Sequence, residues 1–225
     1  LGSFNVIRFQ GQVPTTSLVK VLDTRIYDEY TDVAEAIRKL KQEHPQMSVI
    51  MFVTENAQNP ELYNVAFEYG DPLKTYISTE TLLWNYLEQI VEGLIFLEGQ
   101  GYHYPNISKQ YIIATAKNTV KLLNPYTFSD FMKEILQIYL NPQNQMSNRR
   151  AHFMNNILRN IKELGITLAT LVSNCNEYQL KTDTAYVNKV INSIGAKLSK
   201  SLVLLLQSLI LNNGQLTSFK DVKQL

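Results

Sequence analysis

The spacing of apolar residues changes near position 70, and this change limits the folds that the chain can adopt. Before it, the turn-forming stretches GQVPTT and NAQNP separate short runs rich in Val, Ile and Phe, namely FNVIRFQ, SLVKVLD, SVIMFVTE and LYNVAFEY. Such runs predict strands, whereas one amphipathic run, TDVAEAIRKLKQEHP, has the spacing of a helix. After position 70 helical spacing dominates. The sequence therefore predicts an α+β fold with most strands first.

Helical periodicity is clearest in STETLLWNYLEQIVEGLIFLEGQG, where Ser and Thr stand at the start and Gly at the end. We expect a long buried helix whose apolar stripe is Leu83, Leu87, Ile90, Leu94 and Leu97. YIIAT and TVKLLN are predicted to be two short strands. The rest is predicted to be helical apart from two polar linkers, PQNQMSNRR and NCNEYQLKTDT.

Charge and composition exclude several classes of function. Lys and Arg number 21 against 20 Asp and Glu, so the net charge of +1 gives no global field for nucleic acid or an anionic membrane. The apolar run SLVLLLQSLIL is far shorter than the roughly 18 to 20 residues that span a bilayer, so it predicts a core helix.

Cys175 is the single cysteine, which favours a reducing compartment, the cytoplasm. The start LGSFNVIRF lacks Met and indicates a fragment.

Five segments resemble successive parts of the eukaryotic protein kinases. GSFNVIR resembles the end of the glycine-rich loop, LVKVL the third strand, and YNVAFEYGDPL the fifth strand and hinge, with Phe67 as gatekeeper. QIVEGLIFLEGQGY and NIKELGITLATL are similar to the helix before the catalytic loop and to the central helix. The resemblance spans the chain and implies a bilobal protein-kinase-like fold. A small antiparallel β-rich N-lobe would comprise residues 1–68, truncated at its start, and a mainly helical C-lobe residues 69–225.

The same resemblance identifies the stretch GYHYPNISKQYIIATAKNTVKLLNPY as the counterpart of the catalytic loop and the magnesium-binding motif. Tyr104-Pro105-Asn106 stands for H-R-D and Tyr111 for the metal-binding Asn. Asn124-Pro125-Tyr126 stands for D-F-G. No carboxylate occupies any of these positions.

Each replacement removes a defined chemical capability. The amide of Asn106 is no base at physiological pH, so it cannot accept the proton of a substrate hydroxyl. Asn124 offers magnesium a neutral oxygen without charge, and Tyr111 is a poor ligand for a hard dication. Together the replacements imply a degenerate member of the family, with neither catalytic residues nor a metal site.

Nucleotide binding is a separate question. The resemblance implies vestigial nucleotide-binding positions at Lys20, Phe67, Glu68 and Ile113. Counting along the chain assigns Glu35 as the ion-pair partner of the lysine, but the helical stripe places it on the polar face. Leu18 replaces the small Ala that the family places against adenine. We therefore expect no cofactor.

Elements that regulate active kinases are changed as well. The segment TFSDFMKEILQIYL, residues 127–140, has helical apolar spacing and a capping box, so a fixed helix is expected instead of a mobile loop. Gln143 and Leu216 replace the Glu and Arg of a buried family ion pair, and Asn160 replaces the Asp of the central helix. Loss of both partners leaves no buried charge uncompensated.

The sequence thus predicts a pseudokinase-like domain that binds protein partners as a scaffold or structural subunit, without nucleic acid or membrane. Two alternatives remain: a divergent ATP-dependent protein kinase that recruits carboxylates from elsewhere, and a nucleotide-sensing switch without turnover. The sequence identifies neither the partner nor the oligomeric state.

Overall fold

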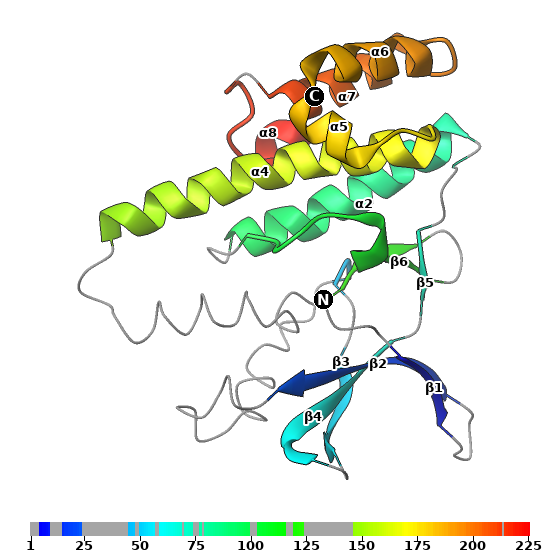
Figure 1. Ribbon diagram of the computed structural model, residues 1–225, viewed down its shortest axis with the longest axis vertical. Helices are drawn as coiled ribbons and strands as arrows, with labels where there is room; N and C mark the ends of the chain where they lie inside the picture. The colour runs from blue at the N-terminus through cyan, green and yellow to red at the C-terminus, as the bar shows by residue number, and fades with distance from the viewer. Residues whose placement is uncertain are drawn as a thin grey trace. The chain divides into compact units, whose positions relative to one another are not determined.

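The computed structural model describes residues 5–9, 15–23, 45–47, 50–56, 59–68, 70–73, 77, 79–99, 103–115, 119–123, 146–212 and 214–225. The chain divides into two compact units, Leu1–Gly70 with Leu122–Gln145, and Asp71–Lys121 with Met146–Leu225. Figure 1 labels their strands and helices along the chain. The helix expected in residues 31–45 and the helix expected in residues 127–140 fall almost wholly outside the described residues, as do Glu35 and Asn124.

The first unit contains a four-stranded antiparallel sheet in the order β1-β2-β4-β3. Its strands are β1 (Asn5–Phe9), β2 (Thr15–Asp23), β3 (Ile50–Asn56) and β4 (Asn59–Glu68). All four strands predicted before position 70 are therefore confirmed. Chain neighbours β1 and β2 pair directly, as do β3 and β4, which is the expected result for strands joined by short turns.

A three-stranded sheet has the order β5-β6-β7, from β5 (Asp71–Pro72), β6 (Ile112–Ala114) and β7 (Val120–Leu122). The 3₁₀ turn η2 (Lys109–Tyr111) leads into β6. Both short strands predicted after residue 110 are confirmed. The Val120 amide donates to Oε1 of Gln89 at 2.9 Å, which joins β7 to the long helix.

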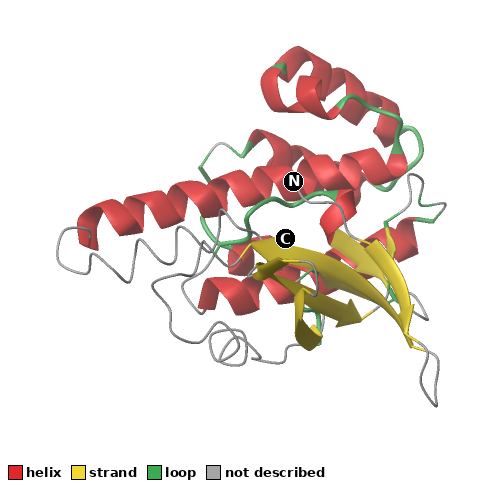
Figure 2. Ribbon diagram, turned by 60° about the horizontal axis from the view of Figure 1, so that its bottom comes forward, coloured by secondary structure: helices red, strands yellow, loops and turns green. Residues whose placement is uncertain are grey.

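Six described helices follow or flank these strands: α2 (Glu80–Gly99), α4 (Met146–Val172), α5 (Glu177–Thr182), α6 (Thr184–Gly195), α7 (Lys200–Leu211) and α8 (Phe219–Lys223). Figure 2 shows them in red, and Figure 1 shows α2 and α4 side by side. All five residues of the stripe predicted in α2 are buried. Helix α7 has five buried aliphatic side chains and is the core helix expected from SLVLLLQSLIL. Among the described residues, no helix combines the length and apolar character needed to cross a membrane.

Two predicted linkers are wrong. Helix α4 already begins at Met146, inside PQNQMSNRR, and α5 occupies most of NCNEYQLKTDT. The Asn176 side chain caps α5 by accepting from the Gln179 amide, and Leu180 is buried beneath it. One cap and one buried leucine stabilise a helix too short to show a periodic apolar pattern.

Close packing joins α4 to α7 at Gly165. A Cβ atom at this position would lie 2.7 Å from Leu209 Cβ and 3.0 Å from the Ile210 backbone nitrogen. Only a residue without a side chain therefore allows the two helices to approach this closely.

Carboxylates of α2 hold the C-terminal helices. Glu80 accepts from the hydroxyl of Ser199 and, at 2.7 Å, from its amide, at the start of α7. Glu98 accepts from the Phe219 amide at 2.8 Å, at the start of α8, and Lys223 pairs with Glu92. The Ser199 hydrogen bonds hold the pKa of the Glu80 carboxyl below its usual value. Glu80 and Glu98 thus satisfy amide groups at the starts of α7 and α8, and Glu92 pairs with the ammonium group of Lys223.

Candidate functional site

The segment His103–Tyr111, here called the anchored loop, contains the positions that the sequence aligns with the catalytic loop of the kinases, including Asn106 and Tyr111. It lies between α2 and β6 within the second unit. Figure 1 shows this green segment running along the two long helices. Its backbone conformation is set by side chains of α4.

Several hydrogen bonds attach the anchored loop to α4, and three of them come from one face of this helix. The Tyr104 amide donates to Asn160 Oδ1 at 2.9 Å, and the Ile107 amide donates to Glu163 Oε2 at 3.0 Å. The Thr167 hydroxyl donates to the Ile107 carbonyl at 3.0 Å. Residues 160, 163 and 167 share one face of a helix because they are three and four positions apart. One helix face thus fixes two backbone positions of the loop.

Burial strengthens this attachment. Tyr104 and Asn160 are both 0 % exposed. The Tyr104 hydroxyl donates to the Tyr111 carbonyl at 3.2 Å, and the Asn160 amide nitrogen donates to Glu163 Oε2 at 3.0 Å. Burial raises the pKa of both tyrosines well beyond physiological pH. Because buried polar groups cost free energy when unpaired, this satisfied network rigidifies the loop.

Glu163 is the carboxylate that the fold brings to the anchored loop, and its oxygens are already engaged. Oε2 accepts from the Ile107 amide and from Asn160, while Oε1 lies 3.5 Å from Arg159 Nε. Arg159 also donates to the Pro105 carbonyl at 3.2 Å. A carboxylate with these partners stabilises the loop but is poorly placed to accept a proton from a substrate.

The structure places the predicted site residues in different surroundings. Asn106 is half-buried, whereas Tyr111 is 6 % exposed and Ile113 in β6 is 1 % exposed. The two buried side chains belong to the core of the second unit. Within the described ranges, no cluster of three or more His, Cys, Asp or Glu side chains could hold a metal ion.

The remaining described positions lie on the four-stranded sheet. Lys20 in β2 is paired with Val65, and Leu18 is paired with Phe67 of β4. The backbone register therefore brings together the predicted gatekeeper and the leucine that replaces the small Ala of the family. Glu68 ends β4 opposite Ser17. The roles of these residues remain predictions.

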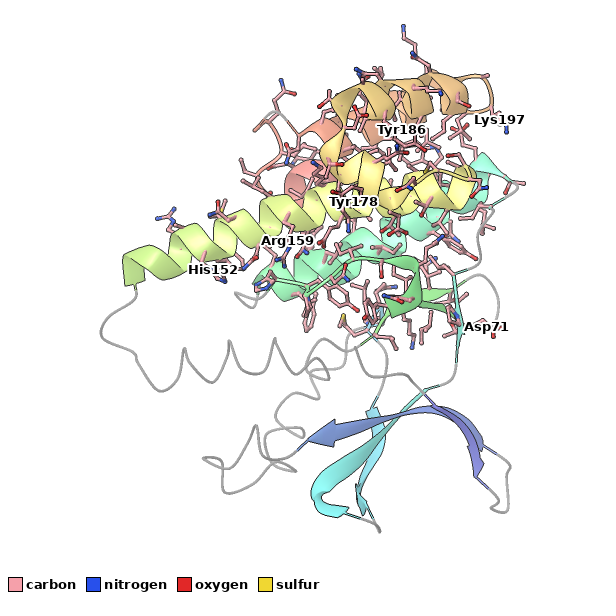
Figure 3. All side chains as sticks on the ribbon, viewed as in Figure 1. Asp71, His152, Arg159, Tyr178, Tyr186 and Lys197 are labelled. Atoms are coloured by element: carbon pink, nitrogen blue, oxygen red, sulfur yellow. The ribbon has the colours of Figure 1, made fainter. Side chains whose placement is uncertain are left out.

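The sequence did not indicate a histidine pair formed by His103, the first residue of the anchored loop, and His152 of α4. His103 is 7 % exposed, and its ring lies edge-on to that of His152 with centroids 6.3 Å apart. Asn156 Nδ2 lies 2.9 Å from His152 Nε2. Burial, with Arg159 and His152 nearby, lowers the pKa of His103 to about 4. The buried imidazole is thus neutral at physiological pH. Figure 3 labels His152 and Arg159 on the same helix.

Glu163 and Thr167 were also missed. Their contacts with the anchored loop join residues 56 and 60 positions apart in the chain. The available signal was the helical spacing of Asn160, Glu163 and Thr167 in α4, a polar pattern that Asn156 and Thr170 continue.

No protein-family model matches the chain, and no curated protein matches it. Among solved structures, it is similar to the PAN3 pseudokinase of Drosophila melanogaster, with a TM-score of 0.70 and 14% sequence identity. The match covers 98% of this chain but only 59% of that chain, so this chain spans less than two thirds of its neighbour. The similarity shows that the chain has a protein-kinase-like fold, with mixed α and β structure and mostly helices.

Proposed function

We propose that this chain is a catalytically inactive, bilobal protein-kinase-like domain that acts as a scaffold, structural subunit or protein-interaction module. The four-stranded sheet would belong to its small N-lobe, and the helical unit would correspond to its C-lobe. Support for the fold comes from the similarity to a solved pseudokinase, and support for inactivity comes from the anchored loop.

One observation carries the proposal. The polar side chains that contact the anchored loop are already hydrogen-bonded to its backbone or to one another, so they are not free to take part in catalysis. Glu163 accepts hydrogen bonds from the Ile107 amide and from Asn160, and Tyr111 is buried. Asn106 leaves the loop with a neutral amide where a base would be needed. Phosphoryl transfer depends on positioned charge and metal ions, so a rigid loop without a free carboxylate supports binding better than chemistry.

The proposal includes protein partners, no cofactor and a cytoplasmic location. The single cysteine supports a reducing compartment, and burial raises the pKa of its thiol, which disfavours the reactive thiolate. The near-neutral net charge supports a protein partner over nucleic acid.

The direct test is a phosphotransfer assay with ATP and magnesium on a generic protein substrate and on the chain itself. We expect no transfer above the background of a Lys20→Ala variant, while an active protein kinase in the same assay gives a clear signal. Magnesium-dependent transfer that Lys20→Ala abolishes would overturn the proposal. A melting-temperature scan with millimolar ATP tests nucleotide sensing separately, because a ligand at 100 times its Kd adds about 2.7 kcal/mol of stability.

A further inference from the structure

We propose that an exposed group of lysines on α5, α6 and α7 binds an acidic segment of a protein partner. The group, here called the lysine face, is defined as Lys181, Lys189, Lys197 and Lys200, which lie on or next to helices that contact one another in the order α5, α6 and α7. This inference rests on the proposed function, because it assigns a chemistry to the partner of an interaction module.

The lysine face has a strong local excess of positive charge. From residue 177 to residue 200 the sequence has four lysines and two carboxylates, Glu177 and Asp183. Asp183 Oδ1 accepts from the amides of Ala185 and Tyr186, at 2.8 and 3.1 Å, and so caps α6. All four lysines are exposed. In the part of the chain that the structure describes, no carboxylate pairs with any of their ammonium groups.

A fifth cation reinforces this charge. Lys162 of α4 donates from Nζ to the Lys181 carbonyl at 3.0 Å, which places its ammonium at the α5 end of the face. Glu80, Glu92 and Glu98 of the same unit are engaged in internal contacts. Although the net charge of the whole chain is only +1, the lysine face therefore carries a local excess of positive charge.

Two exposed apolar side chains lie about one helical turn from lysines of the lysine face. Tyr178 is 73 % exposed and precedes Lys181 by three residues in α5. Leu204 is 51 % exposed and follows Lys200 by four residues in α7. Helical neighbours at these spacings lie on the same side of a helix. Figure 3 labels Tyr178 on α5 and Lys197 in the turn that follows α6.

This combination fits a protein segment best. Exposed tyrosine and leucine supply apolar contacts at an interface, and lysines supply complementarity to Asp or Glu. Nucleic-acid sites favour Arg for bidentate contacts, and residues 160–225 contain no Arg. Around Lys189 the exposed positions of α6 are Asn188, Asn192 and Ser193, which offer no large apolar side chain for insertion into lipid.

The test uses the full chain and a fluorescein-labelled peptide of about ten residues, rich in Glu with two Leu, whose extended reach is at most roughly 33 to 36 Å. Fluorescence anisotropy at low ionic strength should show binding that weakens as salt shortens the Debye length. The double variant Lys189→Glu and Lys197→Glu should weaken binding at least about ten-fold, because like charges would then face each other.

The matched control is the double variant Arg150→Glu and Lys220→Glu, which changes net charge equally outside the lysine face and outside the anchored loop. It should retain binding within about two-fold, as expected when only long-range charge changes. Tyr178→Ala should weaken binding without altering its salt dependence. Equal loss in both double variants, no binding at all, or binding only to poly(U) RNA or to phosphatidylserine vesicles would each overturn the inference.

The same preparations separate this inference from the proposed function. Peptide binding needs neither ATP nor magnesium. The proposed function, in contrast, would be refuted by detectable phosphotransfer activity. Absence of peptide binding in a chain without phosphotransfer therefore refutes the lysine face alone. Phosphotransfer refutes the proposed function whether or not the peptide binds.

Discussion

The anchored loop and the lysine face use polar groups in opposite ways. Around the loop, Asn160, Glu163 and Thr167 are hydrogen-bonded to the protein itself, mostly away from water. On the lysine face, four ammonium groups face solvent without a carboxylate partner among the described residues. Groups already satisfied within the fold stabilise it, whereas unpaired groups remain available to a ligand. The comparison predicts that substitutions in one region change stability and those in the other change binding.

Removing Asn160 should have the largest effect. In Asn160→Ala the buried Tyr104 amide loses its acceptor and Glu163 loses a donor, which should lower the free energy of unfolding by about 2–4 kcal/mol. Urea unfolding followed by circular dichroism measures this change. Asn188→Ala, at an exposed asparagine of α6, is the control and should change the free energy of unfolding by less than about 0.5 kcal/mol. A loss under about 0.5 kcal/mol in Asn160→Ala would contradict a structural role for the network.

Protonation of His103 at acidic pH should lower the free energy of unfolding. Its pKa is about 4 when folded and about 6.5 when unfolded, so the unfolded chain binds more protons between these values. This stability contribution is complete above about pH 6.5 and is lost as the pH falls, by about 2 kcal/mol at pH 5 and about 3 kcal/mol at pH 4. Urea midpoints at pH 7 and pH 5 should differ less in His103→Phe than in the original chain. An identical pH dependence would rule out His103 as the cause.

Thr167→Val should have a smaller effect. The substitution preserves shape but removes the donor to the Ile107 carbonyl, which should cost about 1 kcal/mol. Hydrogen exchange should then show faster exchange of the Ile107 amide, with little change in α7. Uniformly faster exchange would mean that the loop has no separate attachment at this point.

On the lysine face, Lys189→Ala should leave the free energy of unfolding unchanged within about 0.5 kcal/mol. Its ammonium is exposed and has no carboxylate partner among the described residues, so no internal interaction is lost. Thermal unfolding checks this expectation at neutral pH. A clear loss of stability would remove the contrast between the two regions.

Local patterns predicted those elements whose residues contact close neighbours in sequence. The α2 stripe and the strands β1 to β4, β6 and β7 were predicted because periodic apolar residues indicate a buried face without knowledge of the partner. Asn160 was assigned to the Asp of the central helix by alignment, yet its bond to the Tyr104 amide, 56 residues away, was visible only in the structure. The early start of α4 and the short α5 were missed, because a cap and one buried leucine leave no periodic signal.

The hydrogen bonds from α2 to the starts of α7 and α8 also bear on the order in which the chain folds. Glu80 and Ser199 are separated by 119 residues, and Glu98 and Phe219 by 121. During synthesis α2 leaves the ribosome long before either helix start that its carboxylates will hold. Contacts this distant in sequence form late, because a long loop must close first. Until α7 and α8 are made, the growing chain carries an acidic segment whose final partners do not yet exist, so the helical unit closes only after α8 is complete.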